Sequence, residues 1–137
     1  MSTPAVLIID DESSVQSVLE EILNGRGYDI YLAKNGEEGL QKFKEFSPDV
    51  VLLDLNMPEM DGFAFLEAVK PSRLDSYEVI VITGNTENRK VVKCYDLGAE
   101  SILRKPFFAA EVRRVVEHSL ERKKMLRESK NPPSEFK

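Results

Sequence analysis

The run that decides the fold spans residues 50–54 and reads Val-Val-Leu-Leu-Asp. Four consecutive apolar residues followed by a carboxylate are typical of a strand that is buried on both faces of a parallel sheet. Three further strand-like runs also end at polar side chains. They are residues 5–9 before Asp10 and Asp11, residues 79–82 before Thr83, and residues 101–104 before Lys105.

Parallel strands carry their carboxyl ends to one edge of the sheet, so these polar side chains are expected to converge there. Open α/β sheets bind their ligands at this edge. Carboxylates at close range repel one another, and their repulsion predicts a bound cation. Lys105 beside them predicts a second ligand, which is an anion. The simplest pair of ligands is a hard metal ion and a phosphoryl group.

Helical patterns separate the strand-like runs and complete the fold prediction. Apolar residues recur every three or four positions after each run, as on one face of a helix. Residues 28–33 are rich in β-forming residues and predict a second strand. The alternation predicts an α/β fold, a doubly wound five-stranded parallel sheet with five helices. We expect caps on the first and fourth helices at Ser13 or Ser14, at Thr86 and at Gly98.

The composition excludes several classes of protein. The chain has 137 residues, 42% hydrophobic and 31% charged, as in an ordinary globular domain. A net charge of −5 argues against direct binding to nucleic acid. Cys94 is the single cysteine, so no internal disulfide can form. No apolar run approaches the roughly 20 residues of a membrane span, and we expect a cytoplasmic protein without membrane insertion.

The carboxyl-terminal region loses the regular pattern near residue 122. We expect one domain over residues 1–121 and a helix extension or linker, partly disordered, over residues 122–137. The basic residues of the last helix and this extension alternate with glutamates, and a solvated helix face is their default interpretation. A partner-docking helix or a coiled coil is the alternative. The basic residues are Arg113, Arg114, Arg122, Lys123, Lys124 and Arg127. Too few residues remain for an effector domain, and the sequence leaves open whether the protein belongs to a longer chain.

Taken together, the four strand ends resemble the receiver domain of response regulators in two-component signal transduction. The segments that carry the resemblance are Val-Leu-Ile-Ile-Asp-Asp-Glu at 6–12, Val-Leu-Leu-Asp-Leu-Asn-Met-Pro-Glu-Met-Asp-Gly at 51–62, Ile-Thr-Gly at 82–84 and Lys-Pro-Phe at 105–107. Each segment alone is a weak pattern, but four in order, each at a strand end, are specific. The resemblance covers residues 4–120 and implies a flavodoxin-like sheet with strand order 2-1-3-4-5.

The resemblance implies a role for each strand-end residue. Asp54 is the expected phosphoacceptor. Thr83 is expected to hydrogen-bond a phosphoryl oxygen, and Lys105 is expected to pair with the phosphoryl charge. Pro106 is expected to follow a cis peptide bond.

Magnesium is the cofactor that the resemblance implies. Its expected ligands are Asp11, Asp54 and the backbone carbonyl of Asn56, with Asp10 acting through a bound water. Mg²⁺ prefers oxygen ligands and usually takes one or two carboxylates together with waters and phosphate oxygens, which agrees with this set.

Four further positions border the expected pocket. Asn56 and Asn85 each lie two residues beyond a site residue, and we hypothesise that they tune the loss of the phosphoryl group. Gly84 leaves room for that group. Ile102 departs from the family, which usually has an aromatic partner of the switch hydroxyl at this position. Ring rotation cannot report the switch here, so we expect shifts of loops and helices instead.

The leading hypothesis is a phosphorylation switch, not a turnover enzyme. It would accept phosphate from a sensor histidine kinase or a histidine phosphotransfer protein. It would signal to an output domain or protein through the face of the fourth helix, fifth strand and fifth helix, where a homodimer could also form on phosphorylation. A haloacid-dehalogenase-type phosphatase is an alternative, but its chemistry needs an acid where Asn56 stands. A pseudo-receiver that binds partners without phosphate is the other alternative, favoured only by Ile102.

Other chemically reactive side chains are expected to be structural. Glu12 is interpreted as a solvated or capping acid, and Asp61 as a turn residue. His118 is expected on the surface of the last helix, and Cys94 is expected to pack inside the fourth.

Overall fold

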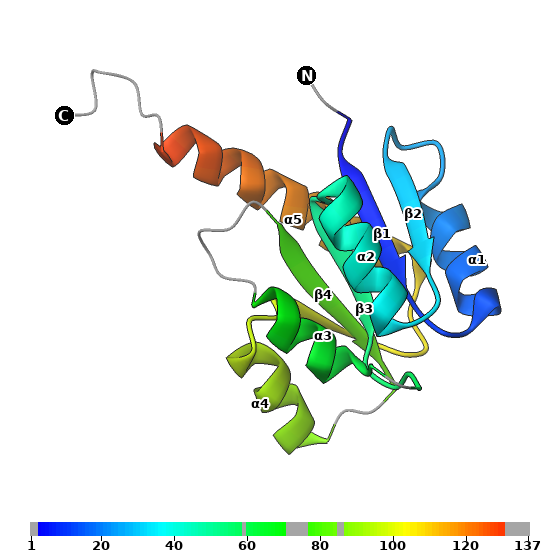
Figure 1. Ribbon diagram of the computed structural model, residues 1–137. Coiled ribbons are helices and arrows are strands. Elements are labelled where there is room, and N and C mark those ends of the chain that lie inside the picture. The colour runs from blue at the N-terminus through cyan, green and yellow to red at the C-terminus, as the bar shows by residue number, and fades with distance from the viewer. Residues whose placement is uncertain (1–2, 59, 71–76, 85–86, 131–137) are drawn as a thin grey trace.

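The computed structural model describes residues 3–58, 60–70, 77–84 and 87–130, with the backbone alone for residues 126–130. Strands and helices alternate along these residues, as the sequence predicts (Figure 1). The strands are β1 (Ala5–Ile9), β2 (Asp29–Ala33), β3 (Val50–Asp54), β4 (Glu78–Thr83) and β5 (Ser101–Arg104). The helices are α1 (Ser13–Leu23), α2 (Gly36–Phe46), α3 (Gly62–Val69), α4 (Asn88–Asp96) and α5 (Ala109–Lys130).

The sheet is parallel and has the order β2-β1-β3-β4-β5, which confirms the order that the resemblance implies. The strand order reverses at β1, because the chain moves outward to β2 and then returns past β1 to β3. Ile9 lies beside Leu53 in the register. The next position along the two strands holds Asp10 and Asp54, so the two acids meet at the order reversal, where such sheets bind ligands.

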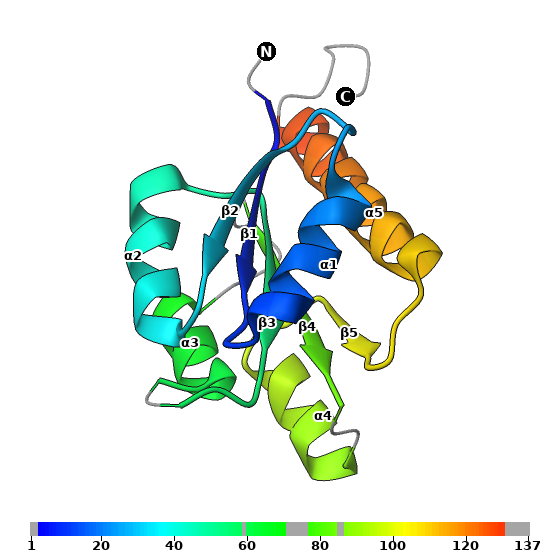
Figure 2. The ribbon, with the colours of Figure 1, turned by 90° about the vertical axis from the view of Figure 1, so that its right-hand side faces the viewer.

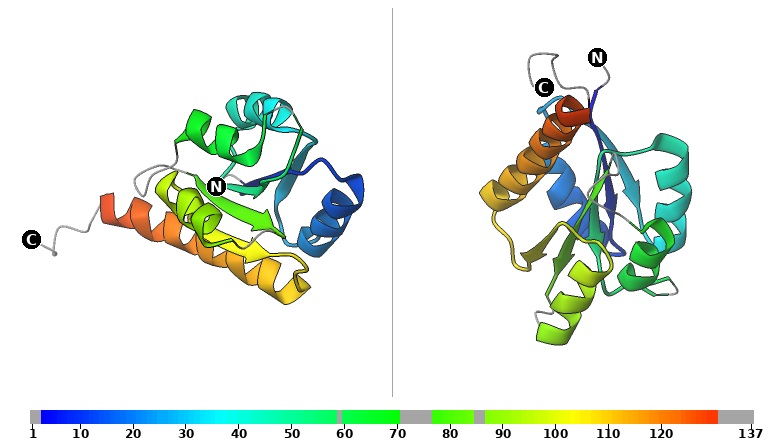
Figure 3. Two further views of the ribbon diagram at one scale, coloured as in Figure 1. Left: turned by 90° about the horizontal axis from the view of Figure 1, so that it is seen from below. Right: turned by 90° about the vertical axis from the view of Figure 1, so that its left-hand side faces the viewer.

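Two layers of helices cover the sheet, and side chains alternate between them along each strand. In β1, Leu7 and Ile9 belong to the core beneath α2, α3 and α4, whereas Val6 and Ile8 belong to the core beneath α1 and α5. Figures 2 and 3 show α1 and α5 on one side of the sheet and α2 and α3 on the other. The central strands β1, β3 and β4 are buried along their whole length, which explains the apolar runs that fill them between their polar end residues.

The observed ends of the helices can be compared with the capping residues that the sequence predicts. Gly98, at φ +102°, follows α4 as predicted, because glycine adopts this conformation without strain. The prediction for Ser13 or Ser14 was wrong, since both lie inside α1 and Glu12 stands at the N-cap. The Asp10 carboxylate already accepts the Glu12 backbone N–H at 2.9 Å, so the turn into the helix is made earlier. Thr86 lies outside the described residues.

The last helix departs from the expected solvated extension. α5 continues to Lys130, and its residues Arg122 and Lys123 bind acids at the amino edge of the sheet. Lys123 is only 4% exposed. The prediction of a solvated face was wrong for Lys123, because its partner Asp49 lies 74 residues earlier in the chain. Arg122 pairs with Glu78, 44 residues earlier, but keeps 38% of its side chain exposed. The domain boundary at residue 121 stays a prediction.

The helices were also compared with the requirements of a membrane span. Within the part of the chain that the structure describes, none of them combines the necessary length with a sufficiently apolar sequence.

Candidate functional site

Acidic side chains gather at the carboxyl edge of the sheet, as the sequence predicts. Asp10 follows β1 and Asp54 ends β3, and the two residues are only 2% and 4% exposed. Asp11 and Glu12 continue from Asp10 into the loop before α1 and are exposed. The carboxylates of Asp10, Asp11 and Glu12 offer oxygens that all lie within 4.8 Å of one another. The edge therefore combines two buried acids with two that face solvent.

Lys105 reaches across this edge to the two buried acids. Its Nζ lies 3.3 Å from Asp10 Oδ2 and 3.6 Å from Asp54 Oδ1. Lys105 directly follows β5, and its backbone N–H donates to the carbonyl of Thr83 at the end of β4 at 2.9 Å, which holds the lysine at this edge. The Lys105–Pro106 peptide bond is cis, as predicted. A single ammonium group shared between two buried carboxylates does not balance their charge.

The excess of negative charge over the single ammonium group affects the ionisation of Asp54. Burial and the nearby carboxylates of Asp10 and Asp11 raise the pKa of Asp54 from 3.8 to about 6. Lys105 and the Asn56 backbone N–H, which lies 3.3 Å from Asp54 Oδ1, lower this pKa without offsetting the rise. A nearby positive charge favours the ionised form of a carboxyl group. A bound cation would therefore relieve the unfavourable ionisation of Asp54.

The donor set at this edge fits a hard divalent cation. Carboxylate oxygens are the ligands that Mg²⁺ prefers, and Mg²⁺ takes few of them at once. Asp11 lies close enough to raise the pKa of Asp54, although the carboxylate oxygens that lie within 4.8 Å of one another are those of Asp10, Asp11 and Glu12. Glu12 is exposed, as predicted, and makes no capping hydrogen bond, and its carboxylate joins the cluster. The residues present are thus able to hold magnesium.

The other predicted site residues lie on β4 and β5 or directly beyond β3 and β4, where the structure describes them. Thr83 ends β4 and is 1% exposed. Gly84 follows it, and a Cβ at Gly84 would meet no atom within 4 Å, so the space beside it is open. Asn56 is exposed just beyond β3. Ile102 is a partly buried residue of β5, packed against the core beneath α2, α3 and α4. Asn85 lies outside the described residues.

A close backbone contact shapes the loop that follows Asp54. The Gly62 N–H donates to the Leu55 carbonyl at 3.0 Å. A Cβ at Gly62 would lie only 2.7 Å from the Asp54 carbonyl oxygen, so a larger residue would push this loop away from β3. Asp61, predicted as a turn residue, caps α3 by accepting the Ala64 N–H at 2.9 Å. The Asp-Gly pair therefore turns the chain back over the end of β3.

The remaining reactive side chains have the structural roles that the sequence predicts. Cys94 is fully buried in α4, and His118 is exposed on α5.

One side chain at the carboxyl edge is absent from the sequence prediction. Gln16, in α1, donates from Nε2 to the carbonyl oxygens of Asp10 and Ala33 at 3.0 and 2.6 Å. A polar residue between the apolar positions of an amphipathic helix is expected to face solvent, so the sequence carries no signal for these contacts. The contacts depend on how α1 lies across the ends of β1 and β2.

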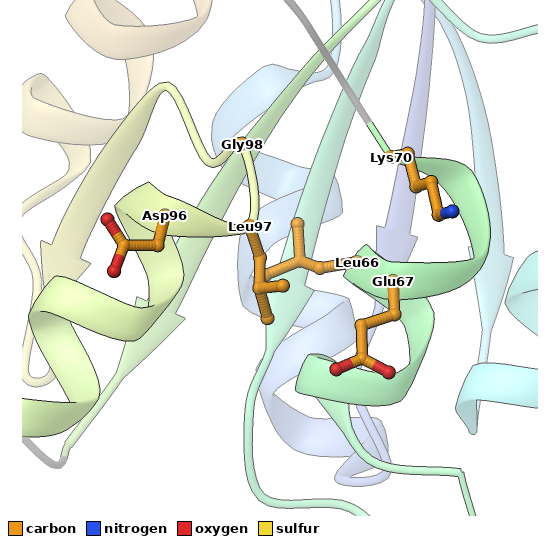
Figure 4. A pocket seen from close by; sticks show the side chains of 6 residues that line it. All are labelled: Leu66, Glu67, Lys70, Asp96, Leu97 and Gly98. Atoms are coloured by element: carbon orange, nitrogen blue, oxygen red, sulfur yellow. The ribbon is translucent and has the colours of Figure 1, made fainter.

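A pocket of about 290 Å³ lies away from the acids, between α3 and α4. Figure 4 shows Leu66 and Leu97 pointing toward each other within it. The full lining is Leu66, Glu67, Lys70, Asp96, Leu97 and Gly98. No residue of the predicted site contributes to this lining, so the pocket gives no support to the chemistry at the carboxyl edge.

Comparison with known proteins identifies the family. The model of the response regulator receiver domain matches residues 6–117. The chain is 32% identical over 132 residues to the alkaline phosphatase synthesis transcriptional regulatory protein PhoP of Bacillus subtilis, covering 96% of this chain and 53% of PhoP. It is 37% identical over 120 residues to the DNA-binding transcriptional regulator NtrC of Escherichia coli K12, covering 88% of this chain and 25% of NtrC. The chain thus spans about half or less of these relatives.

Solved structures agree with the sequence comparison. A CheY-like response regulator receiver domain protein from Methanospirillum hungatei superposes with a TM-score of 0.83 at 25% identity, covering 90% of this chain and 98% of that one. A response regulator receiver domain protein from Clostridium thermocellum gives a TM-score of 0.80 at 31% identity, covering 90% and 98%. With the predicted strand order and the acids at its reversal in place, the chain belongs to the receiver domains of response regulators.

Proposed function

We propose that the chain is a phosphorylation switch in which Asp54 accepts a phosphoryl group in a Mg²⁺-dependent reaction. The donor would be a sensor histidine kinase or a histidine phosphotransfer protein. The observation that carries the proposal is the position of Lys105, whose Nζ lies within 3.6 Å of a buried carboxylate oxygen on either side. This arrangement supplies a nucleophile and a counter-charge for a phosphoryl group at one point of the sheet edge.

The reaction would transfer the phosphoryl group from a donor phosphohistidine to Asp54. A carboxylate oxygen bonds to phosphorus while the P–N bond breaks, and the imidazole leaves with the bonding electrons and takes up a proton. Negative charge spreads over the phosphoryl oxygens during transfer, so catalysis is mainly electrostatic and positional. Lys105 would pair with this charge, Thr83 would donate its hydroxyl to one oxygen, and Gly84 would leave room for the group.

Three groups of the chain would hold the magnesium ion: the carboxylates of Asp11 and Asp54, and the backbone carbonyl of Asn56. When bound, the ion offsets the repulsion among the acids and polarises a phosphoryl oxygen. Asp10 would act through a bound water. Its two oxygens already accept from the Glu12 N–H at 2.9 Å and from Lys105 at 3.3 Å, which supports this indirect role.

The output would follow from the added charge. A phosphoryl group brings about −1.5 to −2 charges and strong acceptors. Thr83, drawn toward it, would shift the connection from β4 to α4. In α4 only Cys94 is buried, while Val92 and Tyr95 are 56% and 49% exposed, so we expect this helix to move. Ile102 would move with the helix and strand, without ring rotation.

The partners and the location of the protein are also proposals. The face of α4, β5 and α5 would bind an output domain or protein, and could form a homodimer on phosphorylation. Receiver domains of response regulators are signalling switches, which supports a role other than that of a turnover enzyme. The cytoplasmic location, and the lack of direct nucleic-acid binding, stay predictions from composition and charge.

The two alternatives make different demands on the same site. A haloacid-dehalogenase-type phosphatase needs an acid where the amide of Asn56 stands. A pseudo-receiver would leave Asp54 unmodified in the presence of Mg²⁺. We further propose that Asn56 and Asn85 tune the lifetime of the phosphorylated state, and unchanged dephosphorylation rates in both substituted proteins would refute that role.

The deciding experiment is labelling with radioactive acetyl phosphate and Mg²⁺. The wild-type chain should acquire hydroxylamine-labile label, and an Asp54→Asn variant or an excess of chelator should prevent it. Label that persists in the Asp54→Asn variant would place the chemistry at another residue. A wild-type protein that binds Mg²⁺ but takes no label from acetyl phosphate or a panel of phosphorylated histidine kinases would favour the pseudo-receiver.

A further inference from the structure

We propose that Gln16 is a positioning residue, whose side-chain amide fixes the Asp10–Asp11 peptide unit and so presents the acid pair to Mg²⁺. The inference rests on the proposed function, because it concerns the same cation. Gln16 belongs to none of the four segments that carry the resemblance to receiver domains. Its role must therefore be argued from the contacts that it makes.

The amide of Gln16 joins the ends of two neighbouring strands. Nε2 donates to the Asp10 carbonyl oxygen at 3.0 Å and to the Ala33 carbonyl oxygen at 2.6 Å. The Asp10 backbone N–H donates to the same Ala33 carbonyl at 3.0 Å. Both hydrogens of one NH₂ group are thus used, and both acceptors lie at the carboxyl edge, where β1 and β2 end.

The loop that Gln16 contacts carries the exposed acids and lacks an ordinary helix cap. Glu12 stands at the N-cap of α1 and makes no side-chain capping hydrogen bond. The Glu12 carbonyl accepts the backbone N–H groups of Val15 and Gln16, both at 3.1 Å, which are first-turn helix bonds that do not depend on the side chain. The restraint specific to Gln16 is therefore its side-chain bond to the Asp10 carbonyl, directly before Asp11.

The consequence for the metal follows from peptide geometry. The Asp10 carbonyl belongs to the same planar unit as the Asp11 nitrogen, so fixing one fixes the direction in which the chain reaches Asp11. Asp11 is exposed and has little packing to restrain it. Hydrogen bonds that orient metal ligands typically change metal affinity by about 10- to 100-fold. Without Gln16, part of the binding free energy would be consumed in ordering this loop.

The test compares the two glutamines of the chain, Gln16 and Gln41. Met has a similar length but no N–H donor, and Gln41 is exposed on α2, so a Gln41→Met variant is the matched control. Calorimetric titration of the full chain with MgCl₂ should give binding about tenfold weaker in the Gln16→Met variant. The control should bind as the wild type does, and a Gln16→Arg variant, which keeps N–H donors, should recover most of the affinity.

Phosphorylation kinetics separate positioning from chemistry. At Mg²⁺ concentrations far above its dissociation constant, the Gln16→Met variant should be labelled by acetyl phosphate at close to the wild-type rate. A rate that stays low at saturation would mean that Gln16 acts on phosphoryl transfer itself, and would overturn the assignment. Unchanged Mg²⁺ affinity would overturn it as well.

Two further outcomes remain decisive. A wild-type chain that binds Mg²⁺ but takes no label from acetyl phosphate or from phosphorylated histidine kinases would refute the proposed phosphorylation. The effect of Gln16 on Mg²⁺ affinity would still be decided by calorimetry. Should the Gln16→Met variant not fold, nuclear magnetic resonance of the ¹⁵N-labelled wild type replaces it. The side-chain amide signals of Gln16 should shift with added Mg²⁺ while those of Gln41 stay fixed, and equal behaviour of the two would refute the inference.

Discussion

Acidic side chains lie at both edges of the sheet, but the two edges differ in how many cations pair with them. At the carboxyl edge, Asp10 and Asp54 are buried and share the ammonium group of Lys105, with the acids of the α1 loop close by. At the amino edge, by contrast, Asp49, Glu78 and Glu100 pair with Lys123 or Arg122 of α5. The contrast separates charges that hold the fold together from charges kept available for a ligand.

At the amino edge, the acidic side chains make several ion pairs and hydrogen bonds with α5. Glu78 accepts from Ser119 Oγ at 2.7 Å and from Arg122 Nη2 at 2.8 Å. Asp49 pairs with the buried Lys123, and its other carboxylate oxygen accepts a backbone N–H of β1 at 2.8 Å. These bonds fasten α5 to the amino ends of several strands. Buried charges are tolerated when they are paired and hydrogen-bonded in this way.

The carboxyl edge departs from that pattern at Asp54, whose pKa is raised to about 6. A structural carboxylate gains nothing from such a shift, whereas groups that bind ligands or react often show one. Four experiments test the comparison, and they are ordered by the size of the expected effect.

Removing the cation of the carboxyl edge should have the largest effect, and the quantity that changes should be the rate of phosphorylation. A Lys105→Met variant should be phosphorylated by acetyl phosphate roughly 100- to 1,000-fold more slowly, because the charge that develops on the phosphoryl oxygens loses its partner. Single-turnover labelling at saturating Mg²⁺ measures the rate. The matched control is Lys34→Met, since Lys34 is exposed beyond β2 at the same edge. Equal slowing of both variants would show a general charge effect.

Removing a cation from the amino edge should affect stability instead. A Lys123→Met variant leaves Asp49 without its ion pair, and breaking such a buried pair costs about 3 kcal/mol of the free energy of unfolding. Urea denaturation of the Mg²⁺-free protein measures it, with Lys124→Met, at an exposed neighbour, as control. The labelling rate of the folded fraction should not change. A stability loss no larger than that of the control would contradict the structural role of this edge.

These two lysines also mark what the sequence could predict. Lys105 follows a strand within a recognisable motif, and parallel topology carries strand ends to one edge, so local pattern and fold class sufficed to predict its place. Lys123 lies in a basic stretch whose local pattern indicates a solvated helix face. Its burial depends on a partner 74 residues away and on how far α5 runs past the sheet, which no local pattern encodes. The contacts of Gln16 were missed for the same reason.

The raised pKa of Asp54 predicts a pH-dependent stability of the Mg²⁺-free protein. Because the folded carboxyl group binds its proton more tightly than the unfolded one, stability falls as pH rises from about 4 through about 6. An Asp54→Asn variant should therefore be more stable than the wild type by about 2 kcal/mol at pH 7 and nearly equal to it at pH 4. Thermal unfolding across this range measures the difference.

Magnesium supplies the control for that prediction. Saturating Mg²⁺ should stabilise the wild type more than the Asp54→Asn variant, since the ion binds the folded wild type better, and the gain at pH 7 should shrink. A gain that is equal at pH 4 and pH 7 would assign the effect to packing rather than to charge.

The smallest effect is expected for an ion pair that belongs to neither edge. Arg26, in the turn after α1, has its Nη1 3.1 Å from Oε1 of Glu117 in α5, and both side chains are more than a third exposed. Such pairs contribute about 0.2–1 kcal/mol, because solvent screens them and two long side chains lose freedom. A double-mutant cycle with Arg26→Ala and Glu117→Ala should give a coupling in this range that fades in 1 M salt. A coupling as large as that of Lys123 with Asp49 would mean that closeness of charges, rather than their burial, sets the energetic difference between the edges and the surface.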